Sequence, residues 1–177
     1  CLVLEPVTAG GGVIVPPRTY FEKIQAVLKK HDVLFVADEV ICGFGRTGNY
    51  WGCQTFGITP DILVCAKALS SSYLPISAVM VNERVFQGIA EGSSAVGTWG
   101  HGFTYSGHPV SCAAALKNIE IMEREDLLGN ARRVGAYFED RMAGLAALPM
   151  VGDVRGSKLM VCVETKMQKE NKIISIF

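Results

Sequence analysis

The sequence has no excess of charge of one sign and no cysteine pattern typical of a metal site. Its 17 Lys and Arg balance 17 Asp and Glu, so the charge favours neither nucleic acid nor an acidic partner. The six cysteines form no C-x-x-C pair, and no histidine spacing completes a zinc site. Several cysteines lie in apolar runs, where a free thiol behaves as a small hydrophobe. We therefore expect a reducing compartment, the cytoplasm, and no metal.

Long apolar runs and repeats are also missing. No stretch approaches the roughly 18 apolar residues of a membrane span, and no signal peptide is recognisable, so we expect no membrane partner. The 177 residues allow one domain, or one domain with part of another. Apolar residues make up 49% and charged residues 19%, which indicates apolar surface meant for another subunit or for a missing part of the chain. Because the sequence begins with Cys1 inside a strand-like run, we expect it to be incomplete at its front.

The hydrophobic pattern predicts alternating strands and helices. Continuous apolar runs predict buried strands, and helical spacing predicts helices. Strands are expected within 1–7, 33–40, 61–69 and 76–81, and helices over 16–32, 109–124 and about 126–147. Residues 92–108 are rich in Gly and Ser and predict a long loop, and 151–165 predict a turn and a strand that open a new unit. The fold class is therefore α/β, with a mainly parallel sheet and flanking helices.

Residues 43–48, GFGRTG, match the dinucleotide fingerprint G-x-G-x-x-G. That fingerprint needs a helix to open at its last glycine, and an acid at the end of the following strand. Here Gly48 is followed by NYWGCQTFGITP, which does not predict a helix opening, and Asp61 precedes the next apolar run instead of following it. We therefore interpret the glycines as turn residues and keep a nicotinamide-dependent enzyme, which would bind a dinucleotide, as a third and disfavoured hypothesis.

Two carboxylates and a lysine follow predicted buried strands. Asp38 and Glu39 end one apolar run, and Lys67 ends the next. Ligands bind at the carboxyl edge of open α/β sheets, so a carboxylate and an amine there fit pyridoxal phosphate: the lysine as a Schiff-base amine, the acid on the ring nitrogen. The alternative is that Asp38 and Glu39 are solvated, or that Glu39 pairs with Arg46, and that Lys67 is a surface lysine.

Five segments bear on this choice: EPVTAGGGVIVPPRTYF, VLFVADEVICGFGRTG, WGCQTFGITPDILVCAKALSSSYLPISAVMV, HGFTYSGHPVSCAAAL and VGDVRG. In their order and spacing, which span about residues 2–156, the sequence resembles the class III, or omega-, aminotransferases of pyridoxal-phosphate fold type I. It is most similar to the amine–pyruvate and omega-amino acid–pyruvate branch. The resemblance implies part of the large domain of a pyridoxal-phosphate-dependent aminotransferase over 1–124, and the helix and first strand of an incomplete small domain over 125–177.

The resemblance also implies roles for individual residues. Lys67 matches the catalytic lysine that forms the Schiff base and moves the proton. Asp38 matches the acid that binds the pyridinium nitrogen, and Val40 the apolar residue packed on the ring. Thr104 matches the residue that holds the phosphate of the partner subunit's cofactor, which implies a homodimer with shared active sites. Glu5 matches an acid near the active site with no assigned role.

Three positions depart from the family pattern, because Ser72, Ser77 and Lys158 stand where glycine is usual. Family members are also longer, and carry a phosphate-binding turn before this segment and most of the small domain after it. The expected function is transfer of an amino group from an amine or omega-amino acid to pyruvate or another keto acid. The competing hypothesis is a truncated, inactive remnant that dimerises or binds something else.

Overall fold

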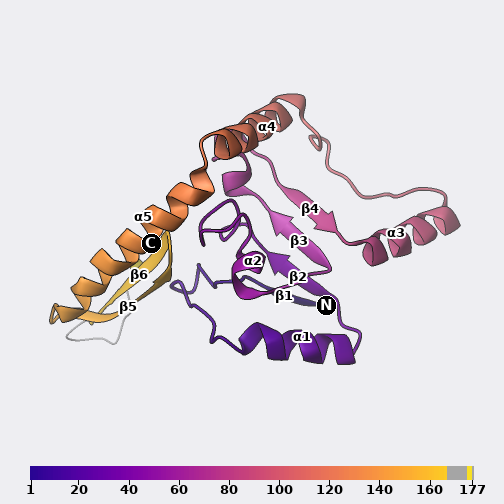
Figure 1. Cartoon of the computed structure of the whole chain (residues 1–177). Helices are drawn as coiled ribbons and strands as arrows, with labels where there is room; N and C mark the ends of the chain where they lie inside the picture. Colours follow the sequence, from indigo (N-terminus) through magenta and orange to yellow (C-terminus); the bar gives the residue numbers. More distant parts are fainter. Residues whose placement is uncertain (167–174, 177) are drawn as a thin grey trace.

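A four-stranded sheet forms the centre of the molecule (Figure 1). The computed structural model describes residues 1–166 and 175–176. Strands β1 (Leu2–Leu4), β2 (Phe35–Asp38), β3 (Ile62–Cys65) and β4 (Ala78–Val81) lie side by side in that order. The β1–β2 and β2–β3 pairs are parallel and the β3–β4 pair is antiparallel. The expected α/β fold with a mainly parallel sheet is therefore confirmed.

Helices connect and cover these strands. They are α1 (Tyr20–Lys30), α2 (Gly52–Phe56), the short 3-10 helix η1 (Lys67–Ser70), α3 (Glu83–Val96), α4 (Pro109–Arg124), α5 (Leu127–Ala143) and the 3-10 helix η2 (Gly144–Ala147). The amphipathic pattern of α1 buries Phe21 and Leu28 in a cluster with Phe35 and Ala37 of β2. Helix α4 begins with Pro109 at its first turn, where the missing N–H costs nothing, and ends at the predicted residue.

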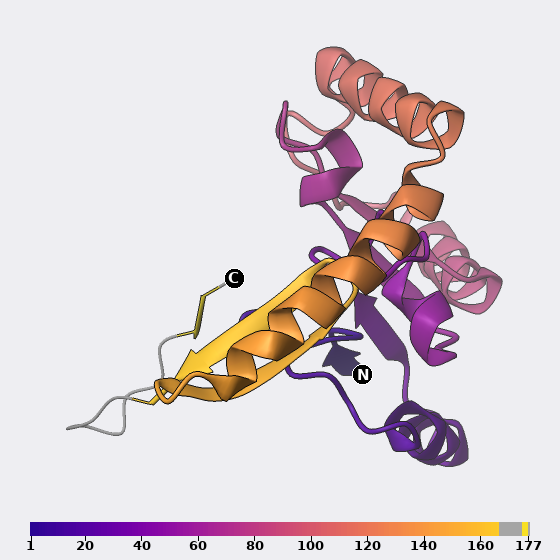
Figure 2. The ribbon, with the colours of Figure 1, turned by 60° about the vertical axis from the view of Figure 1, so that its left-hand side comes forward.

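A second sheet lies against α5 at the other end of the molecule (Figure 2). Strands β5 (Val151–Ser157), β6 (Met160–Thr165) and β7 (Ser175–Ile176) pair antiparallel in that order. Residues 151–165 are thus a hairpin of two strands, where the sequence predicted a turn and one strand. The sequence indicated no partner element for residues 166–177. Strand β7 in this segment pairs with β6, and residues 167–174 and 177 lie outside the described residues.

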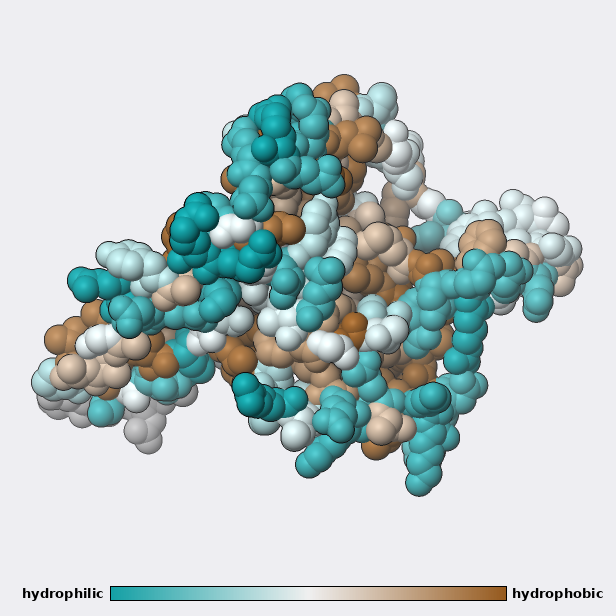
Figure 3. All heavy atoms as spheres, viewed as in Figure 1, coloured by the Kyte–Doolittle hydropathy of each residue, from teal (hydrophilic) through white to brown (hydrophobic). Residues whose placement is uncertain are grey.

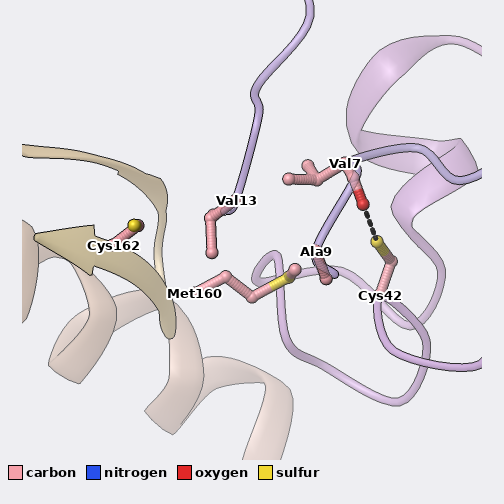
Figure 4. Packing of buried hydrophobic residues seen from close by; sticks show 6 residues of the cluster. All are labelled: Val7, Ala9, Val13, Cys42, Met160 and Cys162. Atoms are coloured by element: carbon pink, nitrogen blue, oxygen red, sulfur yellow. Dashed lines mark hydrogen bonds between the residues drawn. The ribbon is translucent and has the colours of Figure 1, made fainter. Parts of the chain in front are cut away.

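Packing between the two sheets joins the N-terminal segment to the hairpin. Val7, Ala9 and Val13 come from the loop after β1, and Met160 and Cys162 from β6 (Figure 4). Cys42 completes this buried cluster, and its Sγ donates to the Val7 carbonyl over 3.5 Å. Residues about 150 positions apart therefore share one core, which ties the hairpin to the sheet.

Three sequence expectations differ from the structure. Residues 83–96 form helix α3, although the chain was expected to be a loop from residue 92. No α3 residue is buried, and although Val85, Phe86, Ile89 and Ala90 lie at helical spacing, Gly88, Gly92 and the serines disfavour a helix. Strand β4 was expected to be buried on both faces, yet it is an antiparallel edge strand with Val79 65% exposed. In β1, Val3 is likewise 56% exposed.

Hydrophobic side chains remain on the surface around the sheet. In Figure 3 brown atoms gather over the sheet, while α5 is mostly teal. Three aromatic side chains are among the most exposed hydrophobic residues, Tyr73 at 83%, Phe103 at 77% and Tyr105 at 82%. This fits the apolar composition, which predicted surface meant for another subunit or chain segment. Among the described residues, no helix is both long and apolar enough to cross a membrane.

Candidate active site

Charged side chains follow the carboxyl ends of all three parallel strands. Glu5 comes directly after β1, Asp38 is the last residue of β2, and Lys67 lies two positions beyond β3. The register pairs Leu4 with Ala37 and Asp38 with Val64, so the three strands end at nearly the same level. The topology therefore brings Glu5, Asp38 and Lys67 to one edge of the sheet, which is where open α/β sheets bind ligands.

Asp38 is half-buried and partly satisfied by its own turn. Its Oδ1 accepts a hydrogen bond of 3.0 Å from the Val40 backbone N–H. Within the described part of the chain, no hydrogen bond to its Oδ2 is found. One carboxylate oxygen is thus held by the backbone while the other is free to accept from a ligand. Val40, also half-buried, sits in the first turn after the strand.

Lys67 opens the short helix η1 in an uncommon backbone conformation. Its φ is +41°, in the left-handed region that non-glycine residues seldom adopt. Its side chain is exposed, so the amine is accessible. Two residues later Leu69 is buried among Phe44, Cys65 and Met122, and the Ser70 hydroxyl donates to the Leu74 carbonyl over 2.6 Å. The lysine is therefore exposed, but the turn that carries it is anchored in the core.

Glu39, next to Asp38, has a different role from either alternative considered for it. It is fully buried, and its two carboxylate oxygens accept from the backbone N–H groups of Gly52 at 2.9 Å and Cys53 at 2.6 Å. It is neither solvated nor paired with Arg46. These N–H groups are unpaired donors at the start of α2, and a carboxylate there satisfies them. Sequence reasoning missed this because both partners are backbone groups, 13 and 14 residues away.

The glycines after Asp38 are structural, as the sequence interpretation held. A Cβ on Gly43 would lie 2.8 Å from the Glu39 carbonyl and 3.0 Å from the Trp51 ring, so only glycine fits. Gly45 and Gly48 have φ values of +98° and +88°. The Gly48 carbonyl accepts from Arg132 of α5 over 2.9 Å. This loop turns tightly and receives α5, and no helix of dinucleotide-binding type opens at Gly48.

Thiols close to this edge are poor nucleophiles. Burial raises the pKa of Cys42 to about 12, with help from the nearby carboxylates of Glu39, Glu5 and Asp38. Burial likewise raises the pKa values of the Cys53 and Cys65 thiols. All six cysteines are free. A protonated, buried thiol does not attack a carbonyl, which leaves the exposed Lys67 amine as the available nucleophile at the sheet edge.

Thr104 and Glu5 complete the predicted residues. Thr104 is exposed in a turn between α3 and α4, stabilised by a 3.1 Å bond from the Phe103 N–H to the Ser106 hydroxyl. No hydrogen bond among the described residues joins it to Asp38 or Lys67. Glu5 is half-buried, and its carboxylate accepts from the Ala9 N–H over 3.2 Å. The structure thus brings Asp38, Val40, Lys67 and Glu5 to one edge and leaves Thr104 outside that group.

The donor set fits pyridoxal phosphate, because an accessible amine suits its aldehyde and a carboxylate oxygen suits its ring nitrogen. Comparison with known proteins agrees, since the family model Aminotransferase class-III matches residues 1–177. The chain belongs to the class III aminotransferases. The family depends on pyridoxal phosphate, so the cofactor inferred from Lys67 and Asp38 is the cofactor of the family.

Curated relatives and solved structures are transaminases. An uncharacterized aminotransferase of Sinorhizobium fredii is 52% identical over 96% of this chain and 37% of its own length. The chloroplastic gamma aminobutyrate transaminase 3 of Solanum lycopersicum is 49% identical over 89% of the chain and 30% of its own length.

Two solved structures superpose closely on this class III aminotransferase chain. A transaminase with L-alanine superposes with a TM-score of 0.91 and 58% identity, over 94% of this chain and 39% of its own. The omega transaminase of Pseudomonas jessenii in complex with PMP has a TM-score of 0.90 and 54% identity, over 92% and 36%. The chain therefore spans about a third of the length of the relatives it matches.

Proposed function

We propose that this chain supplies the catalytic lysine and the ring-nitrogen acid of a pyridoxal-phosphate-dependent transaminase. The observation that carries the proposal is the placement of Lys67 and Asp38 at the carboxyl ends of neighbouring parallel strands, with the lysine amine exposed. An accessible amine beside a carboxylate with one free oxygen suits this cofactor. The match of residues 1–177 to the class III aminotransferase family supports the proposal independently of this geometry.

Each residue of the proposed site has a distinct task. When bound, pyridoxal phosphate supplies an electron sink for bond breaking at the substrate carbon. Lys67 holds the cofactor through its Nζ, and, once displaced by an amine substrate, moves a proton at that carbon. The carboxylate of Asp38 keeps the ring nitrogen protonated. Val40 packs on the ring, and Thr104 binds the phosphate at the site of a partner subunit.

The names of the relatives support a proposal for the substrate class. A gamma aminobutyrate transaminase is 49% identical to this chain and an omega transaminase is 54% identical, and the structure of another transaminase contains L-alanine. We propose that the amino donor is an amine or an omega-amino acid and the acceptor pyruvate or another keto acid. The amino group moves in two half-reactions, so the donor leaves as a carbonyl compound and the acceptor as an amino acid.

Reductive trapping tests the assignment of the lysine. The purified protein is mixed with pyridoxal phosphate, reduced with borohydride, digested and mapped by mass spectrometry. The label is expected on Lys67, with a visible absorption band that is lost in Lys67→Ala and retained in the control Lys30→Ala, which removes a surface lysine of α1. Label spread evenly over surface lysines would contradict the proposal and favour the non-catalytic remnant. Transfer of an amino group to pyruvate is then assayed with omega-amino acids and arylalkyl amines.

A further inference from the structure

Backbone strain is concentrated in the turn that carries Lys67. Lys67, Ser71 and Ser72 have φ values of +41°, +48° and +61°, so three of six consecutive residues that carry side chains adopt the left-handed region. Such conformations cost energy and persist only where the surroundings hold them. The turn retains its own backbone bonds, from the Ser71 N–H to Ala68 and from the Ser72 N–H to Lys67. The Leu69 carbonyl takes no part in these local bonds, and the Ala68 carbonyl, which accepts from Ser71, has a second lone pair that can accept from elsewhere in the chain.

One side chain of α4 contacts this turn at three points. Asn118 Nδ2 donates to the Ala68 carbonyl over 2.8 Å and to the Leu69 carbonyl over 3.2 Å. Asn118 Oδ1 accepts from the Ser71 hydroxyl over 2.6 Å. All three partners lie within four residues after Lys67. A single half-buried amide therefore bridges almost the whole length of η1.

The packing around Asn118 fixes the amide itself. Ala115 and Met122, one turn before and one turn after it on α4, are buried in the cluster that contains Leu69 of η1. The Met122 sulfur lies 3.8 Å from Nδ2. Ala115 and Met122 anchor this part of α4 in the core, and the bonds to two carbonyls and from Ser71 orient the amide. The side chain of Asn118 therefore links the four-residue turn η1 to the 16-residue helix α4.

We propose that Asn118 is a positioning residue for Lys67: its amide holds the strained turn in the conformation that presents the lysine amine at the sheet edge. The inference rests on the proposed function of Lys67. Two donor bonds to carbonyls carry this role, and the bond from Ser71 orients the amide. An isosteric carboxylate keeps the oxygen that accepts from Ser71, but it has no donor for the two carbonyls and faces them with a negative charge.

The test compares Asn118→Asp with three other variants. Asn118→Ala removes the amide without adding charge, and replaces the first variant if that one does not fold. Ser71→Ala removes only the accepting contact. Asn130→Ala is the matched control, because Asn130 of α5 lines the same surface cleft as Asn118 and Ser71, and the one side-chain bond found for it in the described part of the chain runs from Arg133 of its own helix to its Oδ1. Melting curves and far-ultraviolet circular dichroism first establish that each variant is folded.

Two readouts separate positioning from stability. In the protein without cofactor, amide hydrogen exchange at Ser71 and Ser72 is expected to be about tenfold faster in Asn118→Asp, the size of the loss of one or two hydrogen bonds. With pyridoxal phosphate, borohydride-trapped label at Lys67 is expected to form about tenfold more slowly, and the induced circular dichroism of the visible band to weaken. Asn130→Ala should match the wild type, and Ser71→Ala should lie between the wild type and Asn118→Asp.

Each outcome has a defined meaning. Wild-type rates of labelling and exchange in a folded Asn118→Asp or Asn118→Ala protein overturn the positioning role while the function proposed for Lys67 stands. Equal slowing in Asn130→Ala also overturns it, because the effect would then reflect general loosening of the cleft. A wild-type protein that does not label at Lys67 fails at the proposed function, and this inference falls with it.

Discussion

At the scale of single residues, the adjacent carboxylates of Glu39 and Asp38 differ in role: Glu39 stabilises the fold, and Asp38 is proposed to bind the cofactor. Glu39 is fully buried and binds two backbone N–H groups, whereas Asp38 is half-buried with one oxygen free. We expect Glu39→Ala to lower the free energy of unfolding by about 2–4 kcal/mol, because it leaves two buried donors without acceptors. Asp38→Asn should cost less than about 1 kcal/mol, since an amide oxygen still accepts from Val40.

Urea unfolding of both variants, followed by tryptophan fluorescence and circular dichroism, measures this difference. The same preparations, mixed with pyridoxal phosphate, should show the reverse order: Asp38→Asn weakens the visible band, because a neutral amide does not hold the ring nitrogen protonated. Equal destabilisation by the two substitutions would contradict the assignment of a structural role to Glu39 alone. Glu22→Ala, at an exposed position in the first turn of α1, provides the baseline for loss of a surface carboxylate.

Because several of its thiols are buried, we expect the protein to lose stability at alkaline pH. The pKa of Cys42 is raised from 9.0 to about 12, so the folded chain keeps a proton that the unfolded chain releases in that pH range. The contribution is complete below pH 9 and declines as the pH rises toward 12. Melting temperatures measured from pH 7 to 11 should fall above pH 9, and less steeply in Cys42→Ala. Cys1→Ala, at an exposed cysteine, should leave the slope unchanged.

Some residues could be placed from the sequence and others could not. Asp38 and Lys67 end continuous apolar runs, and the carboxyl ends of parallel strands share one edge, so their common location followed from the pattern. Glu39 and Asn118 could not be placed, because their partners are backbone groups of distant segments that leave no periodic trace. The one signal for Asn118 is a polar amide between Ala115 and Met122, on a helix otherwise apolar at that face.

At the scale of elements, a single carboxylate joins α5 to the turn of the β5–β6 hairpin. Glu139 accepts from the Lys158 backbone N–H over 2.6 Å and from its Nζ over 2.8 Å. Lys158 has a φ of +55°, the conformation in which glycine is the usual residue. We expect Glu139→Ala to cost about 1–2 kcal/mol, because both bonds are lost. Lys158→Gly should change stability by less than about 1 kcal/mol, since relief of strain offsets the lost ion pair.

Urea unfolding and hydrogen exchange in the hairpin test these expectations. Glu139→Gln should give an intermediate loss, because its amide oxygen still accepts from the backbone N–H of Lys158. A Lys158→Gly protein as unstable as Glu139→Ala would show that the lysine is not strained. The departure from glycine noted in the sequence is thus explained by a residue on α5, and Ser72, also at positive φ, is the second departure where glycine is the expected residue.

Element prediction succeeded where burial produced a pattern. Helices α1 and α4 show apolar residues that meet the core, and the parallel strands show continuous apolar runs. Helix α3 buries no residue, and its start is marked by Asn82, whose Oδ1 accepts from the Val85 N–H over 3.0 Å as a helix N-cap. The β5–β6 turn was missed because Lys158-Leu159 has none of the usual turn residues.

At the scale of the whole molecule, the exposed aromatic loop and the exposed lysine support the proposal that a second copy of the chain completes the site. Thr104 lies on a surface turn flanked by Phe103 and Tyr105, both more than three-quarters exposed, and no described hydrogen bond links it to Lys67. Exposed aromatic clusters of this kind mark interfaces. We expect the protein to sediment as a homodimer in which each Thr104 turn reaches the partner's Lys67. Aspartate in place of Phe103 and Tyr105 should shift it toward the monomer.

Mixed dimers give the decisive form of this prediction. Lys67→Ala is expected to abolish trapping of pyridoxal phosphate, and Thr104→Ala is expected to lower affinity for the cofactor phosphate. If sites are shared, a heterodimer of the two variants has one site with both substitutions and one with neither, so about half of the wild-type tight binding and labelling returns. If each site lies within one chain, both sites of the heterodimer stay defective and nothing returns. Differently tagged subunits, co-expressed and purified over both tags, separate these outcomes by cofactor titration and mass spectrometry of the trapped lysine.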